Sequence, residues 1–340
     1  MTEMGTTHAP GGAGEKILDD IFEKVARLRV PAGANRLDLG LDFDGRDGSP
    51  GVHLKLSVQA DVPRGPAAMA GALVEDKAPE VVFGPKGHGA IMVIAMRDIE
   101  ARRPEVKAKI DDILGNDPKS RTDYFIAANW ADRVRLSRPD TRPWHFIDIP
   151  YDPLSPDAEP ALPEPPHAIS QLAAMSEELG RVDDPEKKAD ALCFVLHLIG
   201  DLHQPLHCIT RITADFPAPK GDAGGNLFKI GGHYRELHRL WDDSVNLMLQ
   251  DSAEDLAVEI MQKHTRDSLA RAVAVKEPET WARASYAIAV EHGYRPLEDG
   301  ADGVPRPSSG YLRKARDIGQ RQAALGGYRL ADWLTSLLGG

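Results

Sequence analysis

The sequence predicts a mainly α-helical protein, with one multi-helix domain that follows an N-terminal extension. Two observations predict this fold class. The hydrophobic pattern is helical through most of the chain after about residue 83. Clusters of Pro and Gly, notably over 149–166 and 217–232, separate the helical segments. We expect helices over 88–101, 104–114, 121–136, 166–180, 185–204, 234–250, 252–273, 278–291 and 308–338.

The N-terminal part of the chain differs from the rest in being rich in Gly and Pro. One short helix is expected over 15–28, and the alternating stretches 36–43 and 52–59 are typical of strands. We therefore divide the chain into an extension over 1–82, which is either a small separate element or partly disordered, and a helical domain over 83–340.

Composition and charge limit the function classes. Hydrophobic residues make up 42% and charged residues 27% of the chain, as in soluble globular proteins, and no apolar run reaches the roughly 18 residues of a membrane span. The N-terminus shows no recognisable secretory signal peptide. Two cysteines, Cys193 and Cys208, are too few for a disulfide framework.

The net charge of −11 argues against a protein that binds nucleic acid through a basic surface. Bound dications would reverse the local sign of the charge, because metal ions are often the largest charges in a site. A metal-dependent nuclease therefore stays within the classes that the charge allows.

Taken in chain order, the first segment with candidate chemistry is FGPKGHGAIMVIA, which begins at Phe83. Its glycines and proline form an approach to a helix, and His88 lies near the start of that helix. By itself this is a weak indication of a site.

The next segments are WADRVR, which carries Asp132 and Arg135, and WHFIDIP, which carries His145, Phe146 and Asp148. Asp132 is a candidate metal ligand, and an arginine three residues later suits a phosphate; the alternative is a surface ion pair. We expect the second segment to be extended, with Phe146 and Asp148 on one side and His145 on the other. Phe146 either stacks on a base or packs in the core.

The strongest single motif is HLIGDLHQPLH, which begins at His197 and follows an apolar helix. His197 and Asp201 are four residues apart and share one helix face. A buried carboxylate is costly unless it is paired or binds a metal. Pro205 disrupts the helix, so that His207 is able to turn back toward the same cavity. These residues are either metal ligands or core histidines hydrogen-bonded to an aspartate, and the residues themselves leave both readings open.

The segment HRLWD repeats the spacing of four residues between His238 and Asp242. One such pair is common on helix surfaces, but two in one chain are more telling. Imidazole nitrogens and carboxylate oxygens together are a ligand set that suits zinc.

Together these motifs resemble the S1/P1 nuclease family of zinc-dependent, single-strand-specific nucleases, over roughly 83–340. The resemblance is specific because six motifs occur in the family's order. They are Phe83–His88, Trp130–Arg135, His145–Asp148, His197–His207, Gly221–Asn226 and Leu237–Asp242. The segment 326–334, GGYRLADWL, is similar to the family's closing helix. The resemblance implies the helical single-domain fold that this family shares with zinc phospholipase C.

The resemblance also implies up to three zinc ions and a set of site residues. One ion takes Asp132, His145, His197 and Asp201, a second takes His207, His238 and Asp242, and a third takes His88, a shared Asp201 and the main chain of Phe83. Asp132, Arg135, Asp201 and Asn226 are the implied catalytic residues, with Arg135 and Asn226 near the scissile phosphate. Phe146 and Asp148 fall where the family binds a base. The other histidines, among them His203, match no ligand position and are expected to be structural or at the surface.

This sequence departs from the family at the third site. The family uses the free amino group of an N-terminal tryptophan, whereas 82 residues precede Phe83 here. Either the chain is cut before Phe83, or the third ion is weakly held or absent. Ala284 stands where the family usually has Glu, which we expect to affect stability more than chemistry. Family members are typically secreted, but no leader is recognisable, so the compartment is left open.

The implied function is hydrolysis of single-stranded DNA or RNA to 5′-phosphorylated products by a monomer, with 3′-nucleotidase activity undecided. A zinc phospholipase C is the nearest alternative, because the same fold and ligand set support it. Phe146, Asp148 and the last ligand Asp242, where the phospholipase uses Glu, favour the nuclease. A degenerate, non-catalytic zinc-binding protein is the alternative of another class, and the internal position of Phe83 is its main support.

Overall fold

The computed structural model describes residues 84–155, 159–246, 252–298 and 303–340 with their side chains, and the backbone of 36–44 and 51–59. The chain divides into two compact units, Met1–Ala78 and Pro79–Gly340. In the first unit, β1 (Arg36–Asp44) and β2 (Gly51–Gln59) pair antiparallel. Both expected strands are therefore present, whereas the expected helix over 15–28 and the residue Phe83 lie outside the described residues.

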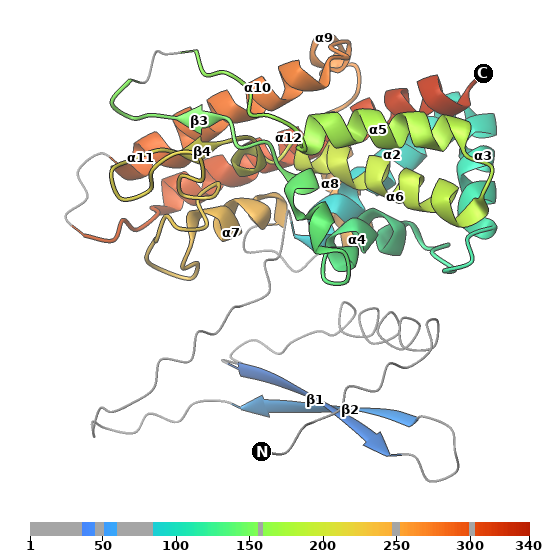
Figure 1. Ribbon diagram of the computed structural model, residues 1–340, viewed down its shortest axis with the longest axis horizontal. Coiled ribbons are helices and arrows are strands. Elements are labelled where there is room, and N and C mark those ends of the chain that lie inside the picture. Colours follow the sequence, from blue (N-terminus) through green and yellow to red (C-terminus); the bar gives the residue numbers. More distant parts are fainter. Residues whose placement is uncertain (1–35, 45–50, 60–83, 156–158, 247–251, 299–302) are drawn as a thin grey trace. The chain divides into compact units, whose positions relative to one another are not determined.

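The second unit is mainly helical, as expected (Figure 1). Its α-helices are α2 (Pro85–Arg102), α3 (Pro104–Gly115), α4 (Tyr124–Val134), α5 (Ala168–Arg181), α6 (Pro185–Asp201), α7 (Leu237–Asp242), α8 (Ala253–Lys263), α9 (Ala270–Val273), α10 (Pro278–Ile288), α11 (Arg295–Glu298) and α12 (Ser309–Leu338). Short 3₁₀ helices η1 (Pro139–His145), η2 (Pro205–Cys208) and η3 (Ser244–Asn246) and a π-helical turn η4 (Ala289–Tyr294) lie between them. Two short strands, β3 (Pro150–Tyr151) and β4 (Thr210–Arg211), pair parallel. No helix in the described ranges is both long and apolar enough to cross a bilayer.

Local sequence explains where the site-bearing helices begin. The side chain of Asp123 accepts hydrogen bonds from the backbone N–H groups of Phe125 and Ile126 at the start of α4. Asp184 caps α6 in the same way, and Pro185 occupies the first turn, where its missing N–H costs nothing.

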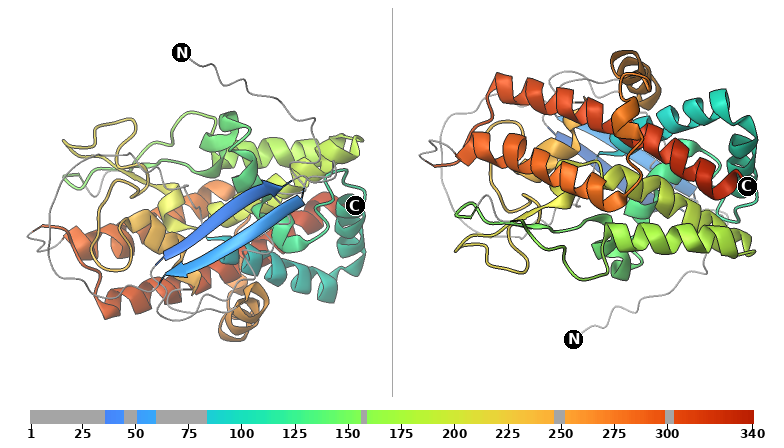
Figure 2. Two further views of the ribbon diagram at one scale, coloured as in Figure 1. Left: turned by 90° about the horizontal axis from the view of Figure 1, so that it is seen from below. Right: turned by 90° about the horizontal axis from the view of Figure 1, so that it is seen from above.

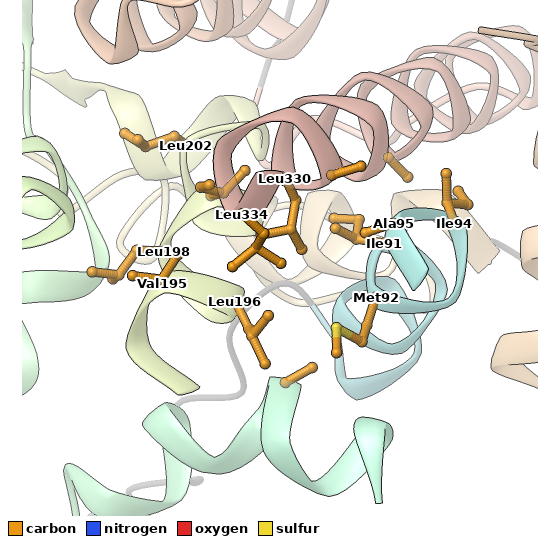
Figure 3. Packing of buried hydrophobic residues seen from close by; sticks show 14 of the residues in the cluster. Ile91, Met92, Ile94, Ala95, Val195, Leu196, Leu198, Leu202, Leu330 and Leu334 are labelled. Carbon is orange, nitrogen blue, oxygen red and sulfur yellow. The ribbon is translucent and has the colours of Figure 1, made fainter. Parts of the chain in front are cut away.

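The core lies where α2, α6 and α12 meet (Figure 3). Ile91 and Ala95 from α2 face Leu330 and Leu334 from α12, with Leu196 from α6 close by, and all are buried. The two further views also show α2 and α12 side by side (Figure 2). This packing buries α6 almost completely from Ala191 onward, so its polar residues His197 and Asp201 are enclosed in the interior.

Two expected helices are shorter or broken. The helix expected over 252–273 is interrupted between α8 and α9, because the Thr265 hydroxyl accepts from the Ser268 N–H and the Ser268 hydroxyl donates to the Thr265 carbonyl oxygen. Such side-chain bonds compete with the helix backbone. The helix expected over 234–250 is present only as α7 and η3, and 247–251 lie outside the described residues.

The expectation of a fully extended segment around His145 was also partly wrong. His145 is the last residue of the 3₁₀ helix η1, and only Phe146 onward is extended, with φ −145° and ψ 166° at Phe146. The Thr141 hydroxyl donates to the Arg138 carbonyl oxygen at 2.8 Å and favours this tight turn.

Candidate metal centre

Five imidazoles and three carboxylates from distant parts of the sequence converge inside the helical unit. They come from α2, α4, the end of η1, α6, η2 and α7: His88, Asp132, His145, His197, Asp201, His207, His238 and Asp242. Their side chains are fully buried except for those of Asp132, which is 18% exposed, and His238, which is 12% exposed. Within the described residues they form three groups with ligand atoms close enough to share an ion: His88–Asp132–His197, His145–His197–Asp201 and His207–His238–Asp242.

Asp201 lies at the middle of this cluster. Its Oδ1 is 3.3 Å from His88 Nε2 and 3.2 Å from His207 Nδ1. Its Oδ2 is 3.2 Å from His145 Nδ1 and 3.2 Å from His197 Nε2. One carboxylate therefore faces four imidazoles, with its two oxygens turned toward different pairs, which is the arrangement a bridging ligand requires.

The other two carboxylates, those of Asp132 and Asp242, each lie near two of the imidazoles. Asp132 Oδ1 is 3.4 Å from His197 Nε2 and 3.5 Å from His145 Nδ1. Asp242 Oδ1 is 3.4 Å from His207 Nε2 and 3.5 Å from His238 Nε2. The expected first set, which adds Asp132 to His145, His197 and Asp201, is brought together, and so is the expected second set.

Backbone carbonyls orient three of the rings. The Nδ1–H of His197 donates to Ala128 O at 2.7 Å, that of His207 to His145 O at 2.9 Å, and that of His238 to Gly224 O at 2.7 Å. Because a carbonyl oxygen can only accept, each neutral ring keeps its lone pair on Nε2. Metal-binding histidines are commonly oriented in this way.

Several buried polar atoms in the cluster make no hydrogen bond with any described residue, although opposite charges lie within ion-pair distance. Among them are His145 Nε2, His197 Nε2, His207 Nε2, Asp132 Oδ1 and Asp201 Oδ1. Buried polar atoms are nearly always hydrogen-bonded, so a group of such orphans requires an explanation. A set of buried imidazole nitrogens and carboxylate oxygens that lie this close together fits bound metal ions.

Charges within the cluster shift its pKa values strongly. Burial acts to lower the pKa of His197, but the nearby charges of Asp201 and Asp132 raise it to about 10. Burial also opposes protonation of His207, whose pKa is nevertheless raised to about 10 by Asp201 and Asp242. Burial lowers the pKa values of His88 and His145. In the metal-free protein, His197 and His207 are therefore protonated at neutral pH, and their positive charges lie beside Asp201.

This distribution predicts the pH dependence of the metal-free protein. The folded-state pKa of His197 and His207 lies above the ordinary value of 6.5, so their contribution to stability is complete below about pH 6.5 and is lost as pH rises through 10. The lowered pKa values of His88 and His145 change the stability of the folded protein only below pH 6.5. We expect the urea midpoint of protein held in chelator to fall between pH 6.5 and 10, and to fall less in His197→Gln. An equal fall in both proteins would contradict the assignment.

The expected alternation after His145 is confirmed in the burial pattern. Ile147 and Ile149 are completely buried, whereas Phe146 and Asp148 are only partly buried. Burial, and then the charge of Asp222, raises the pKa of Asp148 to about 7. Phe146 and Asp148 thus form an aromatic–carboxyl pair on the less buried side of a strand-like segment next to the cluster.

Arg135 is buried at the end of α4, and one of its terminal nitrogens lies 3.6 Å from Asp132 Oδ1. The Asp132/Arg135 pair is therefore not a solvated surface ion pair. Asn226 lies in the loop that also provides the Gly224 carbonyl for His238, and its side chain donates to the Ala223 carbonyl oxygen at 2.8 Å. The described residues do not include Phe83.

Two residues inside the HQPLH motif support the cluster without being candidate ligands: sequence analysis missed the role of Gln204, whereas His203 is structural, in agreement with the expectation. Gln204 donates from Nε2 to Asp242 Oδ1 at 2.7 Å and accepts from the Leu206 N–H, so it ties two ligand-bearing segments together. His203 donates to Ile199 O and accepts from Arg329 at 2.8 Å. It thus supports the end of α6 from outside the cluster, as a structural histidine. The only signal for Gln204 was its place within the motif.

Gln204→Leu should weaken the His207–His238–Asp242 group without unfolding the protein. Removing a residue that hydrogen-bonds to a metal ligand typically lowers metal affinity or activity by roughly 10–100-fold. We expect a change of this size in the affinity for the ion held by that group, measured by competition with a fluorescent chelator. Gln171→Leu, at a partly buried position on α5, provides a matched control. Unchanged affinity in Gln204→Leu would show that the bond to Asp242 is incidental.

A helical unit that encloses a cluster of histidines and aspartates of this kind is a helical domain with a candidate centre for several metal ions, an arrangement typical of metal-dependent hydrolases. The family described as S1/P1 Nuclease matches residues 83–339. The chain belongs to this nuclease family, and is therefore an enzyme of the phosphodiesterase class that acts on nucleic acid.

Curated relatives agree with this assignment. Nuclease P1 of Penicillium citrinum is 28% identical over 291 residues, which covers 76% of this chain and 98% of that protein. Nuclease S1 of Aspergillus oryzae is 26% identical over 278 residues, with 74% and 90% covered. Endonuclease 2 of Arabidopsis thaliana is 25% identical over 289 residues, with 76% and 91% covered.

Proposed function

We propose that this protein is a zinc-dependent phosphodiesterase that hydrolyses single-stranded DNA or RNA to 5′-phosphorylated products. The single observation that supports this most is Asp201, whose two oxygens face four imidazoles at 3.2–3.3 Å. A buried donor set of nitrogen and oxygen atoms without thiolates suits zinc among the common dications, whereas Mg²⁺ and Ca²⁺ prefer oxygen donors alone.

The assignment of ligands follows the three groups. One ion is held by His145, His197, Asp201 and Asp132, and a second by His207, His238 and Asp242. A third is held at His88, which lies close to Asp201 and belongs to a group with Asp132 and His197. When bound, zinc lowers the pKa of a water molecule toward neutrality and polarises phosphoryl oxygens.

The surrounding residues place the substrate. The Arg135 guanidinium lies beside the cluster and would bind the non-bridging oxygens of the scissile phosphate. Asn226 would donate to the same phosphate. Phe146 would stack on a base, and Asp148 would accept a hydrogen bond from the base edge. A base can reach Phe146 only when it is splayed out of a helix, so single strands are preferred.

Phe146→Ala should lower the affinity for single-stranded substrate. Base–aromatic stacking is worth about 1–3 kcal/mol by alanine substitution, or roughly 5–150-fold in KM. Phe146→Trp keeps an aromatic face and should retain most of the affinity. If Phe146→Ala leaves KM for single-stranded DNA unchanged, Phe146 is a packing residue.

The catalytic domain in this proposal is 83–340, and full occupancy of the third site depends on the backbone at Phe83. An amide nitrogen inside a chain is a poor ligand, whereas a free amino group carries a lone pair. A protease site engineered before Phe83 tests this: cleavage should raise the zinc content of the purified protein toward three ions per chain. If the zinc content is the same before and after cleavage, Phe83 takes no part.

The function is tested by parallel assays of one purified preparation with single-stranded DNA, duplex DNA, 3′-nucleotides and phosphatidylcholine vesicles. We expect cleavage of single-stranded DNA with 5′-phosphate ends, and slower cleavage of the duplex. Hydrolysis of phosphatidylcholine alone would make the protein a phospholipase. Zinc binding without any hydrolysis would make it a degenerate member of the family.

A further inference from the structure

His88 lies against the backbone of α6 at a position where only glycine leaves room for it. A Cβ atom built on Gly200 would be 2.6 Å from His88 Nδ1 and 2.9 Å from His88 Cε1. Both distances are shorter than any real contact of this kind. The imidazole therefore occupies the space that the side chain of any other residue at 200 would fill.

The backbone conformation does not explain a glycine at this position. Gly200 is inside α6, where its φ is not in the left-handed region, and the helix continues to Asp201. Glycine in a helix is less favourable than alanine by roughly 0.5–1 kcal/mol. The absence of a Cβ must therefore serve the neighbour that takes up the space, which is His88.

The position of His88 decides where its ring nitrogen lies in the cluster. Its ring stacks on that of His197, with centroids 3.8 Å apart and planes 16° apart. From there, its Nε2 lies 3.3 Å from Asp201 Oδ1. Pushing the ring away from Gly200 would disturb the stacking and move Nε2 relative to Asp201.

Helix α2 cannot easily move away to relieve such a clash, because it is closely packed on two other sides. A Cβ at Gly89 would be 2.6 Å from the Phe125 ring, and a Cβ at Gly327 would be 2.5 Å from Ile94 Cγ2. A methyl group at residue 200 would therefore rotate or tilt the imidazole of His88 rather than displace the whole helix.

We infer that Gly200 is a positioning residue that sets the reach of His88 into the cluster, so that the ion held at His88 can be lost separately from the other ions. This inference rests on the proposed function, because it takes His88 to be a ligand. His88 is the only proposed ligand among the three atoms nearest to the Gly200 Cβ position, and the third atom belongs to Ile91, so the clash falls first on His88.

The test compares Gly200→Ala with Gly180→Ala, a helical glycine on α5 whose Cβ would meet nothing within 4 Å. The wild type and both variants of the full chain are equilibrated with zinc at the lowest free concentration that fills the His88 site of the wild type, and the ions per chain are counted by elemental analysis. We expect Gly200→Ala to hold one ion fewer than the wild type, with kcat reduced and KM little changed, and Gly180→Ala to match the wild type. The visible spectrum of cobalt-loaded protein should lose the contribution of one site.

A double-mutant cycle with His88→Ala distinguishes a clash with His88 from general damage to α6. It also keeps the inference testable if Gly200→Ala alone folds poorly. In the His88→Ala background, Gly200→Ala should leave the ion count unchanged and should not lower the melting temperature, because the space at 200 is then empty. An equal effect of Gly200→Ala in both backgrounds would overturn the inference, as would an unchanged ion count in Gly200→Ala alone. A wild-type chain that binds no zinc would instead refute the proposed function.

Discussion

Asp201→Asn should nearly abolish hydrolysis while leaving the fold intact. The change keeps the shape of the side chain but removes the charge that lies within 3.3 Å of four imidazoles, and it replaces one ligand oxygen by an NH₂ group that cannot bind a cation. Loss of a hydrogen bond to a metal ligand already costs roughly 10–100-fold in activity or metal affinity, so loss of Asp201, the proposed bridging ligand, should cost more. We expect kcat for single-stranded DNA to fall by more than about 10²-fold, with at least one ion lost per chain.

Asp98→Asn is the matched control for this prediction. Asp98 is also buried and is paired with Arg102 and Arg266, but it lies on the part of α2 away from the cluster. Its change should lower stability without changing the number of ions. If Asp201→Asn keeps the activity of the wild type, the cluster is not the site of hydrolysis, whatever Asp98→Asn does.

Removal of metal should destabilise the helical unit by an amount visible in its melting temperature. The cluster joins α2, α4, α6 and α7, so ions bound there connect segments that are far apart in the sequence. A ligand at 1,000 times its Kd stabilises the folded state by about 4 kcal/mol. In a domain of this size, each kcal/mol shifts the melting temperature by roughly 2–4 °C. We expect a fall on the order of 10 °C for each tightly held ion when a strong chelator is added, reversed by zinc.

The effect of the chelator on the melting temperature should also differ between the wild type and Asp201→Asn. In Asp201→Asn the chelator should lower the melting temperature much less than in the wild type, because fewer ions remain to be removed. A wild-type melting temperature that is insensitive to chelator and to added zinc would show that the orphaned polar atoms of the cluster are not metal ligands.

The helical fold could be predicted from sequence because apolar periodicity and N-terminal caps are local signals. Asp184 and Pro185 mark the start of α6 correctly, and the apolar stretch that follows is as buried as expected. The break between α8 and α9 was missed, because it depends on hydrogen bonds made by the hydroxyl groups of Thr265 and Ser268. Such bonds form only in a particular backbone geometry, which the composition of a segment does not specify.

His203 and His207 show which features of the site the sequence can predict and which it cannot. They are four residues apart in one motif, and both are fully buried. Burial, and then the charge of Arg329, lowers the pKa of His203 to about 3, whereas the carboxylates raise the pKa of His207 to about 10. Arg329 and Asp242 are far from the motif in sequence, although Asp201 is only six residues from His207. The resemblance to the family distinguished them in advance, but their spacing could not.

The sequence by itself determined the fold class, the family and the identity of the histidines and aspartates that are candidates for the centre, because motif order and helical periodicity are written along the chain. Only the tertiary structure decided that Asp201 faces four imidazoles, that Gln204 holds Asp242, and that His88 needs the space above Gly200. The physical reason is that these contacts depend on how closely packed helices approach one another. That approach is set by the packing of many side chains at once, and no single segment contains it.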